Sequence, residues 1–294
     1  MSKKTSSGRS ALAFIITFAV AFLLFFGVMV WMMLDWWEPT KAPQETTPTT
    51  TTAPIITPVT KPDRHMLLIA EDGGEARGFT VLSFEPAMAR VRVVPIPRET
   101  VVTIGTDEQR LFQLYQNGSV TEVCRAIGQL LGWDIPHYAV MTYGNLEQLV
   151  TYLNSGVIFT LTETVSYPAP GGGTVTMREG ARTLSASQVT DLLRYDKWHG
   201  GRRARATIHG DIWAALLDQY FVVGRFDEND SGFRKFISLT RSNILASDYT
   251  DARADLLSLA RRNSFDICTV ISPAGEFIGV GDAMRFEMAD KPLG

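Results

Sequence analysis

Short apolar segments recur along the chain from about residue 63, and their patterns predict β-strands. HMLLIA (65–70) is almost entirely apolar, which indicates a buried strand. FTVLSFEP (79–86) alternates between apolar and polar residues, EPAM at its end indicates a turn, and RVRVVPI (90–96) pairs back on it. Further strands are predicted at 137–142, at 157–162, as an edge strand after the turn in YPAPGGGTVTM, and at DICTVIS and EFIGVG.

Helical patterns occupy the intervals between these strands. Ser119 and Glu122 form a capping box for a helix that ends at Gly132, and Ser185 with Gln188 opens another helix. Other helices are predicted at 145–154, from about 203 to 222, and at about 250–262. Strands that alternate with helices predict an α/β domain built of layers.

The N-terminal part follows a different pattern. Residues 11–34 carry no charge, and at about 1.5 Å per residue a helix of this length spans roughly 36 Å, enough to cross a bilayer. Basic residues precede the segment, so the positive-inside rule predicts a cytoplasmic tail at 1–10 and export of everything after the anchor. A cleaved signal peptide is the alternative, but the apolar stretch is long for one. We therefore expect a single-pass protein of the cell membrane with a cytoplasmic N-terminus.

Residues 35–62 form a linker by composition. The tract is rich in proline and threonine and has too little apolar surface to offset the entropy of ordering it. Its prolines favour an extended chain, which holds the following part away from the membrane. The extracytoplasmic domain is therefore expected at 63–294.

The composition of the chain limits the kinds of site that it can form. The 294 residues carry a formal net charge of -3, with only two cysteines and four histidines, too few for a disulfide framework and without metal-ligand spacing. PGGGT (170–174) lacks the lysine of a phosphate loop. The basic run HGGRRARATIHG (199–210) suits nucleic acid in a cytosolic protein. An exported domain meets no nucleic acid, so we expect an exported anion as its partner.

The end of the strand at 90–96 carries the most specific chemical pattern. Pro95 and Pro97 cannot donate to a sheet ladder, so they shape a rigid strand exit that presents Arg98. The alternative is that Arg98 is an ordinary surface arginine at the end of a strand. Asp72 precedes two glycines, so for this residue the alternative is that it is an ordinary turn residue. Three arginines lie between positions 202 and 205, at the predicted start of a helix, where positive charge is unfavourable because of the helix dipole. This favours an anion as their binding partner. The alternative is that they are solvent-exposed residues at the helix start.

The order of these features resembles the LytR-CpsA-Psr family of Gram-positive envelope proteins. Its core typically reads as a strand ending Gly-x-Asp, then Arg-Ser-Asp-Thr, a hairpin and Ile-Pro-Arg-Asp-Thr. Here LLIAEDGGEARGFTVLSFEPAMARVRVVPIPRET follows the single predicted anchor. RLFQLYQNG, LLGWDIPHYAVMTYGNLEQLVTYLNSGV and LSASQVTDLLRYDKWHGGRRARA resemble later segments, so the resemblance covers most of residues 66–290.

The resemblance implies a three-layer α/β/α sandwich with a mixed central sheet and an apolar groove for a polyprenyl chain. It implies transfer of glycopolymers, such as teichoic acids or capsule, from a polyprenyl-pyrophosphate carrier to peptidoglycan. Magnesium held by aspartates and a ring of arginines would bind the pyrophosphate, since guanidinium groups suit phosphate oxygens. We expect a phosphotransferase with a lipid-linked glycopolymer, peptidoglycan and the membrane as partners.

Family positions can be carried over residue by residue. Asp72 stands at the first family aspartate and is the expected Mg²⁺ ligand. Arg98 is the arginine of Ile-Pro-Arg, and Glu99 keeps a carboxylate beside it. The expected catalytic arginines are Arg98, Arg194, Arg202 and Arg205, and the expected substrate-binding residues are Arg110, Arg77, Glu99 and Phe79.

Three positions depart from the family pattern. Arg-Ser-Asp-Thr is Arg77-Gly78-Phe79-Thr80 here, Asp196 replaces the second arginine of Arg-x-Arg, and Ala206 replaces a glutamine. Phe79 is then either a core residue or part of the lipid groove. If the alignment with the family pattern is shifted by a residue or two, Glu71 and Asp196 are the carboxylate pair. Two hypotheses follow: an active glycopolymer transferase, or a catalytically degenerate domain that binds lipid-linked glycan as an accessory or regulatory protein.

Overall fold

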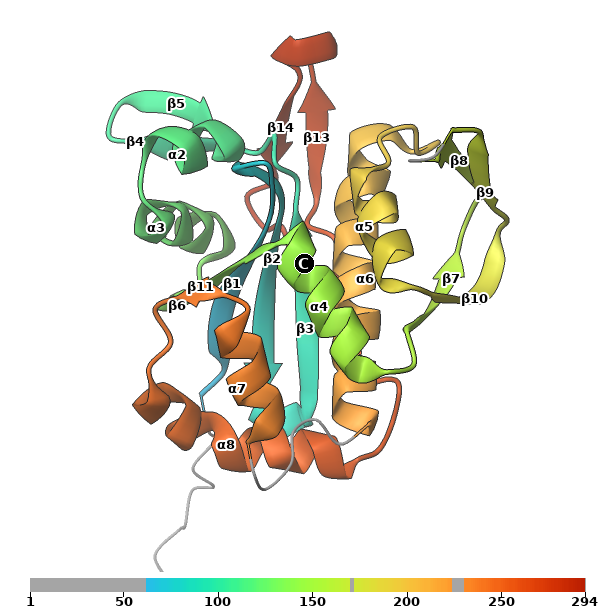
Figure 1. Cartoon of the computed structure of the whole chain (residues 1–294). Coiled ribbons are helices and arrows are strands. Elements are labelled where there is room, and N and C mark those ends of the chain that lie inside the picture. Colours follow the sequence, from blue (N-terminus) through green and yellow to red (C-terminus); the bar gives the residue numbers. More distant parts are fainter. Residues whose placement is uncertain (1–61, 170–171, 224–229, 294) are drawn as a thin grey trace, which may run out of the picture. The chain divides into compact units, whose positions relative to one another are not determined.

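The computed structural model describes residues 62–169, 172–223 and 230–293 (Figure 1). The predicted anchor at 11–34 and all but the last residue of the predicted linker lie outside these ranges, so both stay predictions. Across the described ranges, no helix combines the length and the apolar character needed to span a bilayer.

A six-stranded mixed sheet forms the centre of the domain, in the order β11-β6-β1-β2-β3-β12 (Figure 1). Strands β1, β2 and β3 pair antiparallel as a meander, whereas β6 joins β1 and β12 joins β3 in parallel. The predicted mixed α/β fold with a mixed central sheet is therefore confirmed. The strands are β1 (Arg64–Asp72), β2 (Glu75–Glu85), β3 (Arg90–Ile96), β6 (His137–Thr142), β11 (Arg241–Ser242) and β12 (Cys268–Val270).

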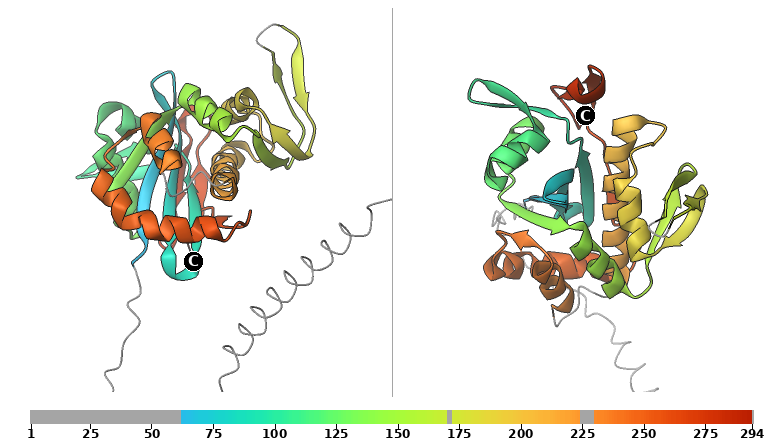
Figure 2. Two further views of the ribbon diagram at one scale, coloured as in Figure 1. Left: turned by 60° about the horizontal axis from the view of Figure 1, so that its bottom comes forward. Right: turned by 45° about the horizontal axis from the view of Figure 1, so that its top comes forward.

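Helices cover both faces of this sheet (Figures 1 and 2). Because successive strand residues point to opposite faces, Leu67 and Ile69 of β1 pack into one apolar cluster and Leu68 and Ala70 into another. The first cluster lies under α2 (Leu111–Asn117) and α3 (Val120–Leu131). The second lies under α4 (Tyr143–Leu153), α5 (Ala186–Arg194), α6 (Gly201–Val222) and α8 (Ala246–Arg261), with α7 (Ser231–Ser238) beside it.

Local signals in the sequence place several helix ends. The Ser119 side chain accepts from the backbone N–H of Glu122, and α3 ends at Gly132 in the left-handed conformation, which confirms the predicted capping box and stop. Ser185 caps α5 in the same way. Helix α4 begins two residues before its predicted start, because Thr142 caps it by accepting from the N–H of Asn145.

Within the described ranges, four two-stranded sheets lie outside the central sheet, and their placement differs from the prediction. The predicted strand at 157–162 pairs only with β10, and the predicted strand EFIGVG pairs only with β14. Helices α2 and α7 were not predicted. The paired strands are β4 (Val101–Ile104) with β5 (Asp107–Arg110), β7 (Val157–Leu161) with β10 (Gly180–Leu184), β8 (Val165–Pro168) with β9 (Thr174–Met177), and β13 (Gly275–Ile278) with β14 (Arg285–Met288).

Helix α6 approaches strand β3 closely at one point. A Cβ atom added to Gly210 would lie 2.8 Å from Cγ of Pro95, a rigid ring that cannot move aside easily. Glycine at this position therefore sets the distance between α6 and β3, the strand that leads to Arg98.

We expect Gly210→Ala to lower the free energy of unfolding by about 1–3 kcal/mol, the usual cost of overpacking a core. Gly144→Ala in α4 is the matched control, because nothing lies within 4 Å of its added Cβ atom. That control should leave stability unchanged or raise it by up to about 1 kcal/mol. Urea unfolding of both variants checks this, and equal stabilities would contradict the proposed contact.

Candidate functional site

The segment Pro97–Arg98–Glu99 forms a corner at the end of β3, and three neighbouring parts of the chain fix its backbone. The Thr100 hydroxyl donates to the Pro97 carbonyl at 2.7 Å. The N–H of Phe112 in α2 donates to the Arg98 carbonyl at 3.2 Å, and the N–H of Phe286 in β14 donates to the Glu99 carbonyl at 2.9 Å. The corner is therefore a rigid mount, as the two prolines predicted.

Glu99 joins this corner to helix α6. Its carboxylate is buried, and one oxygen, Oε1, accepts from Arg202 at 3.0 Å and from Arg205 at 2.6 Å. The two arginines lie three residues apart, on one face of the helix. Glu99 was expected to contact substrate directly. The structure shows its carboxylate orienting both guanidinium groups, and contact with substrate stays a prediction.

Arg98 lies beside these two arginines with a different environment. Its guanidinium stacks over the Phe112 ring at 4.7 Å and has no hydrogen-bond or ion-pair partner within the described part of the chain. Burial lowers the pKa of Arg98 from its usual value, with further lowering by Arg205 and Arg77, while Glu99 opposes the effect. An anion at this position would supply the missing partner.

Four arginines, Arg77, Arg98, Arg202 and Arg205, line a narrow cleft of about 10 Å³, which is the size of one water molecule. His209 also lines it, and sequence reasoning did not single this residue out. It lies one helical turn after Arg205, so the i,i+4 spacing on α6 was the available signal. The lining residues are Arg77, Gly78, Phe79, Ile96, Arg98, Glu99, Arg202, Arg205, Ala206 and His209.

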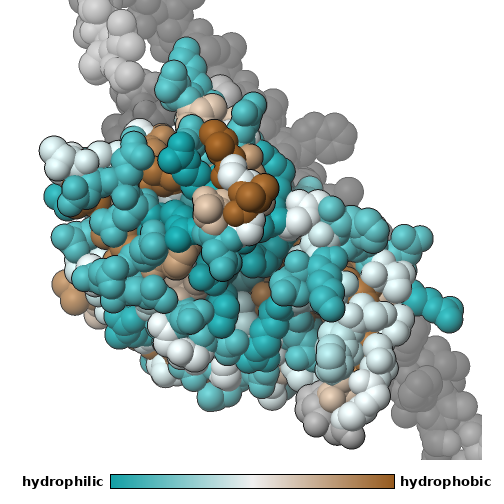
Figure 3. All heavy atoms as spheres, turned by 90° about the horizontal axis from the view of Figure 1, so that it is seen from above, coloured by the Kyte–Doolittle hydropathy of each residue, from teal (hydrophilic) through white to brown (hydrophobic). Residues whose placement is uncertain are grey.

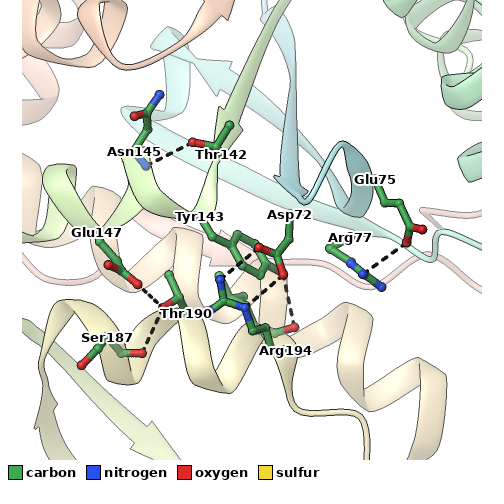
Figure 4. A network of polar contacts seen from close by, with 11 residues as sticks. Asp72, Glu75, Arg77, Thr142, Tyr143, Asn145, Glu147, Ser187, Thr190 and Arg194 are labelled. Carbon is green, nitrogen blue, oxygen red and sulfur yellow. Dashed lines mark hydrogen bonds and ion pairs between the residues drawn. The ribbon is translucent and has the colours of Figure 1, made fainter. Parts of the chain in front are cut away.

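Asp72 and Arg194 form a bidentate ion pair at the neighbouring strand end (Figure 4). Both carboxylate oxygens accept from the guanidinium at 3.0 Å, and this hydrogen bonding lowers the pKa of Asp72. Arg194 also stacks over Tyr143 at 5.0 Å. Sequence reasoning assigned Asp72 to metal and Arg194 to phosphate, whereas the structure pairs them with each other.

The carboxylates do not gather into a metal site. Glu71 accepts from the Tyr115 hydroxyl at 2.5 Å, away from Asp72, and Asp196 is exposed. Phe79 is fully buried against Tyr115 under α2 and α3. No group of three or more His, Cys, Asp or Glu side chains suited to a metal ion occurs within the ranges that the structure describes.

Of the other expected substrate-binding residues, Arg77 lines the cleft, whereas Arg110 is not among its lining residues. Arg77 pairs with Glu75 at 3.2 Å (Figure 4). Arg110 donates to Gln113 in the first turn of α2 and to the carbonyl of Asp282. Arg202 donates to the Gly281 carbonyl at 2.7 Å, so the β13–β14 hairpin holds two of the cations. Seen from above, this end of the molecule is mainly hydrophilic, with small apolar patches (Figure 3).

A second, larger pocket of about 440 Å³ lies further along α6. Its apolar walls come from α4, α6, α7, α8 and the halves of β1 and β2 remote from the arginines. Phe79 does not line it, so the core interpretation of this residue holds. The apolar lining includes Met66, Leu68, Leu82, Phe84, Leu149, Trp213, Leu216, Leu217, Tyr220, Phe233, Phe236, Tyr249, Leu256 and Leu259.

One face of α6 carries residues that line the cleft and, further along, residues that line this pocket. Arg202, Arg205 and His209 line the cleft, and Trp213, Leu216 and Tyr220 follow on the same face at spacings of three or four residues. At about 1.5 Å per residue, Arg205 and Trp213 are roughly 12 Å apart along the helix. The helix thus joins a cationic site to an apolar one.

The LytR_cpsA_psr family model matches residues 70–262. The chain belongs to this family. The match covers more than half of the chain and includes every arginine named above; the β13–β14 hairpin lies beyond it.

Solved structures share the fold of this LytR_cpsA_psr protein. TagV of B. subtilis superposes with a TM-score of 0.65 at 16% identity, covering 79% of this chain and 92% of TagV. A transcriptional regulator from Enterococcus faecalis has a TM-score of 0.63 at 15% identity, covering 79% and 83%. TagT bound to LI-WTA has a TM-score of 0.58 at 16% identity, covering 79% and 86%. Among curated protein sequences, none matches significantly.

We expect Glu99→Leu to destabilise the protein by about 3 kcal/mol, because it leaves two partly buried arginines without their shared carboxylate. Glu287→Leu is the matched control, since Glu287 forms an exposed pair with Arg285. The control should change stability by less than about 1 kcal/mol. Urea unfolding measures both, and a neutral Glu99→Leu would show that Glu99 does not organise the site.

Proposed function

We propose that this LytR_cpsA_psr protein is a membrane-anchored transferase that moves a glycopolymer from a polyprenyl-pyrophosphate carrier to peptidoglycan. The observation that carries the proposal is the single face of α6 that runs from the arginine cleft into the apolar pocket. A polyprenyl pyrophosphate has the same two parts, a dianionic head and a long apolar tail.

The negative charge of the head group suits the arginines that line the cleft. Because the cleft holds only about one water molecule, the phosphates would bind at its mouth. In the transfer, an acceptor hydroxyl forms a bond to the phosphorus next to the glycan, loses its proton, and displaces polyprenyl monophosphate. Negative charge develops on the leaving phosphate, and preorganised cations aimed at that charge lower the barrier. Among the residues that the structure describes, Arg98 has no competing hydrogen-bond or ion-pair partner, and Arg202 and Arg205 are oriented by Glu99.

The tail suits the second pocket. Aliphatic and aromatic side chains from four helices and two strands surround it, and about 440 Å³ accommodates several isoprene units of a polyprenyl chain. TagT, which shares the fold, binds a lipid-linked wall teichoic acid. This supports a lipid-linked glycopolymer as the partner.

Magnesium fits only in combination with the substrate. Mg²⁺ is commonly held by one or two carboxylates together with substrate phosphates. Asp72 is the carboxylate available on this side of the sheet, and Arg194 occupies both of its oxygens. Asp72, together with oxygens of a bound phosphate, would hold the ion, which would neutralise negative charge on the phosphate groups.

The proposed location follows from the N-terminal sequence. The uncharged segment at 11–34 would anchor the chain, and the linker would hold the domain on the outer side, where lipid-linked glycans and peptidoglycan meet.

A binding module without turnover is the second candidate. The observation that favours it is the buried Phe79 at a family carboxylate position, together with Asp72 already engaged by Arg194. Such a protein would hold the lipid-linked glycan as an accessory or regulatory component of the envelope.

We expect Arg98→Ala to reduce transfer by about 10²–10³-fold, the usual effect of removing one preorganised charge-stabilising group. The assay uses the full chain in nanodiscs with Mg²⁺ and a polyprenyl-pyrophosphate-linked glycan, and measures release of polyprenyl monophosphate. Arg178→Ala is the control, because Arg178 is exposed and distant from the cleft in the fold.

Undiminished release by Arg98→Ala would contradict the assignment of the cleft. Binding of the lipid-linked glycan by the wild type without any release would favour the binding module.

The tail site has a separate test. We expect Leu256→Trp to fill part of the pocket and weaken binding of a long-chain polyprenyl pyrophosphate at least tenfold, with inorganic pyrophosphate binding unchanged. Ile158→Trp, at an exposed position outside the pocket, is the control. Equal effects on both ligands, measured by calorimetry, would show that the pocket does not hold the tail.

A further inference from the structure

A polar pocket lies beside the arginine cleft, on the face of the sheet that α2 and α3 cover. Its volume is about 500 Å³, within the usual range of small-ligand sites. The end of β1, the turn into β2, the segment between α2 and α3, and strands β6 and β11 contribute its walls. None of the groups assigned to the phosphates or to the lipid tail lines it.

Three polar side chains from distant segments meet in this pocket. The Tyr115 hydroxyl donates to Oε2 of Glu71 at 2.5 Å and accepts from Nη2 of Arg241 at 3.0 Å, while Arg241 and Glu71 form an ion pair at 3.7 Å. Burial and the hydrogen bond to Glu71 raise the pKa of Tyr115 to about 12, so the phenol keeps the proton that it donates. Tyr115 therefore holds the carboxylate and the guanidinium in fixed positions.

This network leaves hydrogen-bonding capacity open to the solvent. The side chains of Arg241 and Glu71 are 61% and 19% exposed. Among the described residues, neither the second carboxylate oxygen of Glu71 nor the remaining N–H groups of Arg241 have a hydrogen-bond partner. A ligand in the pocket can therefore donate to Glu71 and accept from Arg241.

The opposite charges of the two side chains select the class of ligand. A phosphate would be attracted by Arg241 but repelled by Glu71, and an apolar group would leave both charges without partners. A hydroxyl group both donates and accepts, so neighbouring hydroxyl groups of a sugar ring can bind a carboxylate and a guanidinium at once. A sugar unit therefore suits this pocket.

Helix α2 sets the separation between the pocket and the cleft. Arg98 stacks over the Phe112 ring at 4.7 Å, and Tyr115 lies three residues further along the same helix. At about 1.5 Å per residue, the two positions are roughly 4.5 Å apart along the helix axis. The Tyr115 ring also packs edge-on against Phe79, which lines the cleft. A ligand in the pocket would thus lie next to a phosphate at the mouth of the cleft.

The polar pocket and the apolar pocket proposed for the lipid tail lie on opposite faces of the sheet. Helices α4, α6, α7 and α8 form the apolar pocket, whereas Tyr115 belongs to α2 on the other face (Figure 1). In phosphoryl transfer, the incoming and leaving oxygens lie roughly in line on opposite sides of the phosphorus. A sugar on the α2 side is therefore placed to approach the phosphorus while the lipid phosphate leaves on the other side.

We propose that Glu71 and Arg241 bind a sugar unit of the glycan acceptor and hold one of its hydroxyl groups beside the phosphate at the arginine cleft. Tyr115 is a positioning residue, because it acts through the other two. This inference rests on the proposed function and adds the site of the acceptor to it.

Saturation-transfer NMR on the full chain in nanodiscs tests the sugar site, with a soluble peptidoglycan fragment of two disaccharide units as the probe. We expect Arg241→Gln and Glu71→Gln each to raise the dissociation constant for the fragment at least about tenfold, the effect of losing a hydrogen bond to a charged group. Binding of inorganic pyrophosphate, measured by calorimetry, should change by less than about twofold, because neither residue lines the cleft and solvent screens their charges.

Arg178→Gln is the matched control, because Arg178 is exposed between β9 and β10, far from α2 in the fold (Figures 1 and 2). It should bind the fragment as the wild type does. Equal binding of the fragment by the wild type and Arg241→Gln would overturn the sugar site, and so would a wild type that binds no fragment. Pyrophosphate binding by the wild type would then leave the arginine site of the proposed function intact, whereas its absence would overturn that site separately.

Transfer kinetics separate the acceptor from the glycan of the carrier. Arg241→Gln should raise the KM for the peptidoglycan fragment at least about tenfold and leave the KM for the polyprenyl-pyrophosphate-linked glycan unchanged. A higher KM for the carrier alone would show that the pocket holds the carrier's own glycan, which contradicts the proposal. An equal rise in both KM values would show that the three residues only brace the fold, which also contradicts it.

Discussion

The buried carboxylate of Glu99, shared by Arg202 and Arg205, is the interaction on which the site depends. It ties the end of β3 to the start of α6, two elements that a hundred residues of chain separate. The guanidinium groups gathered at one cleft repel one another, and a low-dielectric surrounding strengthens that repulsion. Glu99 offsets this repulsion for Arg202 and Arg205 through hydrogen-bonded ion pairs and for Arg98 through its charge alone. Among the described residues, Arg98 therefore has no hydrogen-bond or ion-pair partner.

Helix α6 gives the site its direction. The same face presents cations near its N-terminus and aromatic or aliphatic side chains further on, and Gly210 lets it lie against Pro95 of β3. A rigid helix holds these two regions at a constant separation. The β13–β14 hairpin, beyond the family match, supports the cationic end through the carbonyls that accept from Arg202 and Arg110.

The carboxylate side of the site differs from the family pattern in a physically consistent way. Phe79 is part of the core, Asp72 is bound by Arg194, and Gly78 makes room for the ring of His209. Cations therefore dominate the cleft. These groups, more than a metal ion held by protein carboxylates, would balance the negative charge of a bound phosphate.

The sequence by itself determined the features that depend on near neighbours: the strands with clear alternation, the capped helices at Ser119 and Ser185, and the proline-framed exit that presents Arg98. It also predicted the family and the arginines of the site. Tertiary structure alone decided the partners of those residues. At the start of helix α2, the Gln113 side chain accepts from the N–H of Arg110, and β7 leaves the central sheet to pair with β10. Asp72 pairs with Arg194, and Glu99 and His209 line the cleft with the arginines. Each of these contacts joins segments far apart in the chain, and no local pattern encodes such a distance.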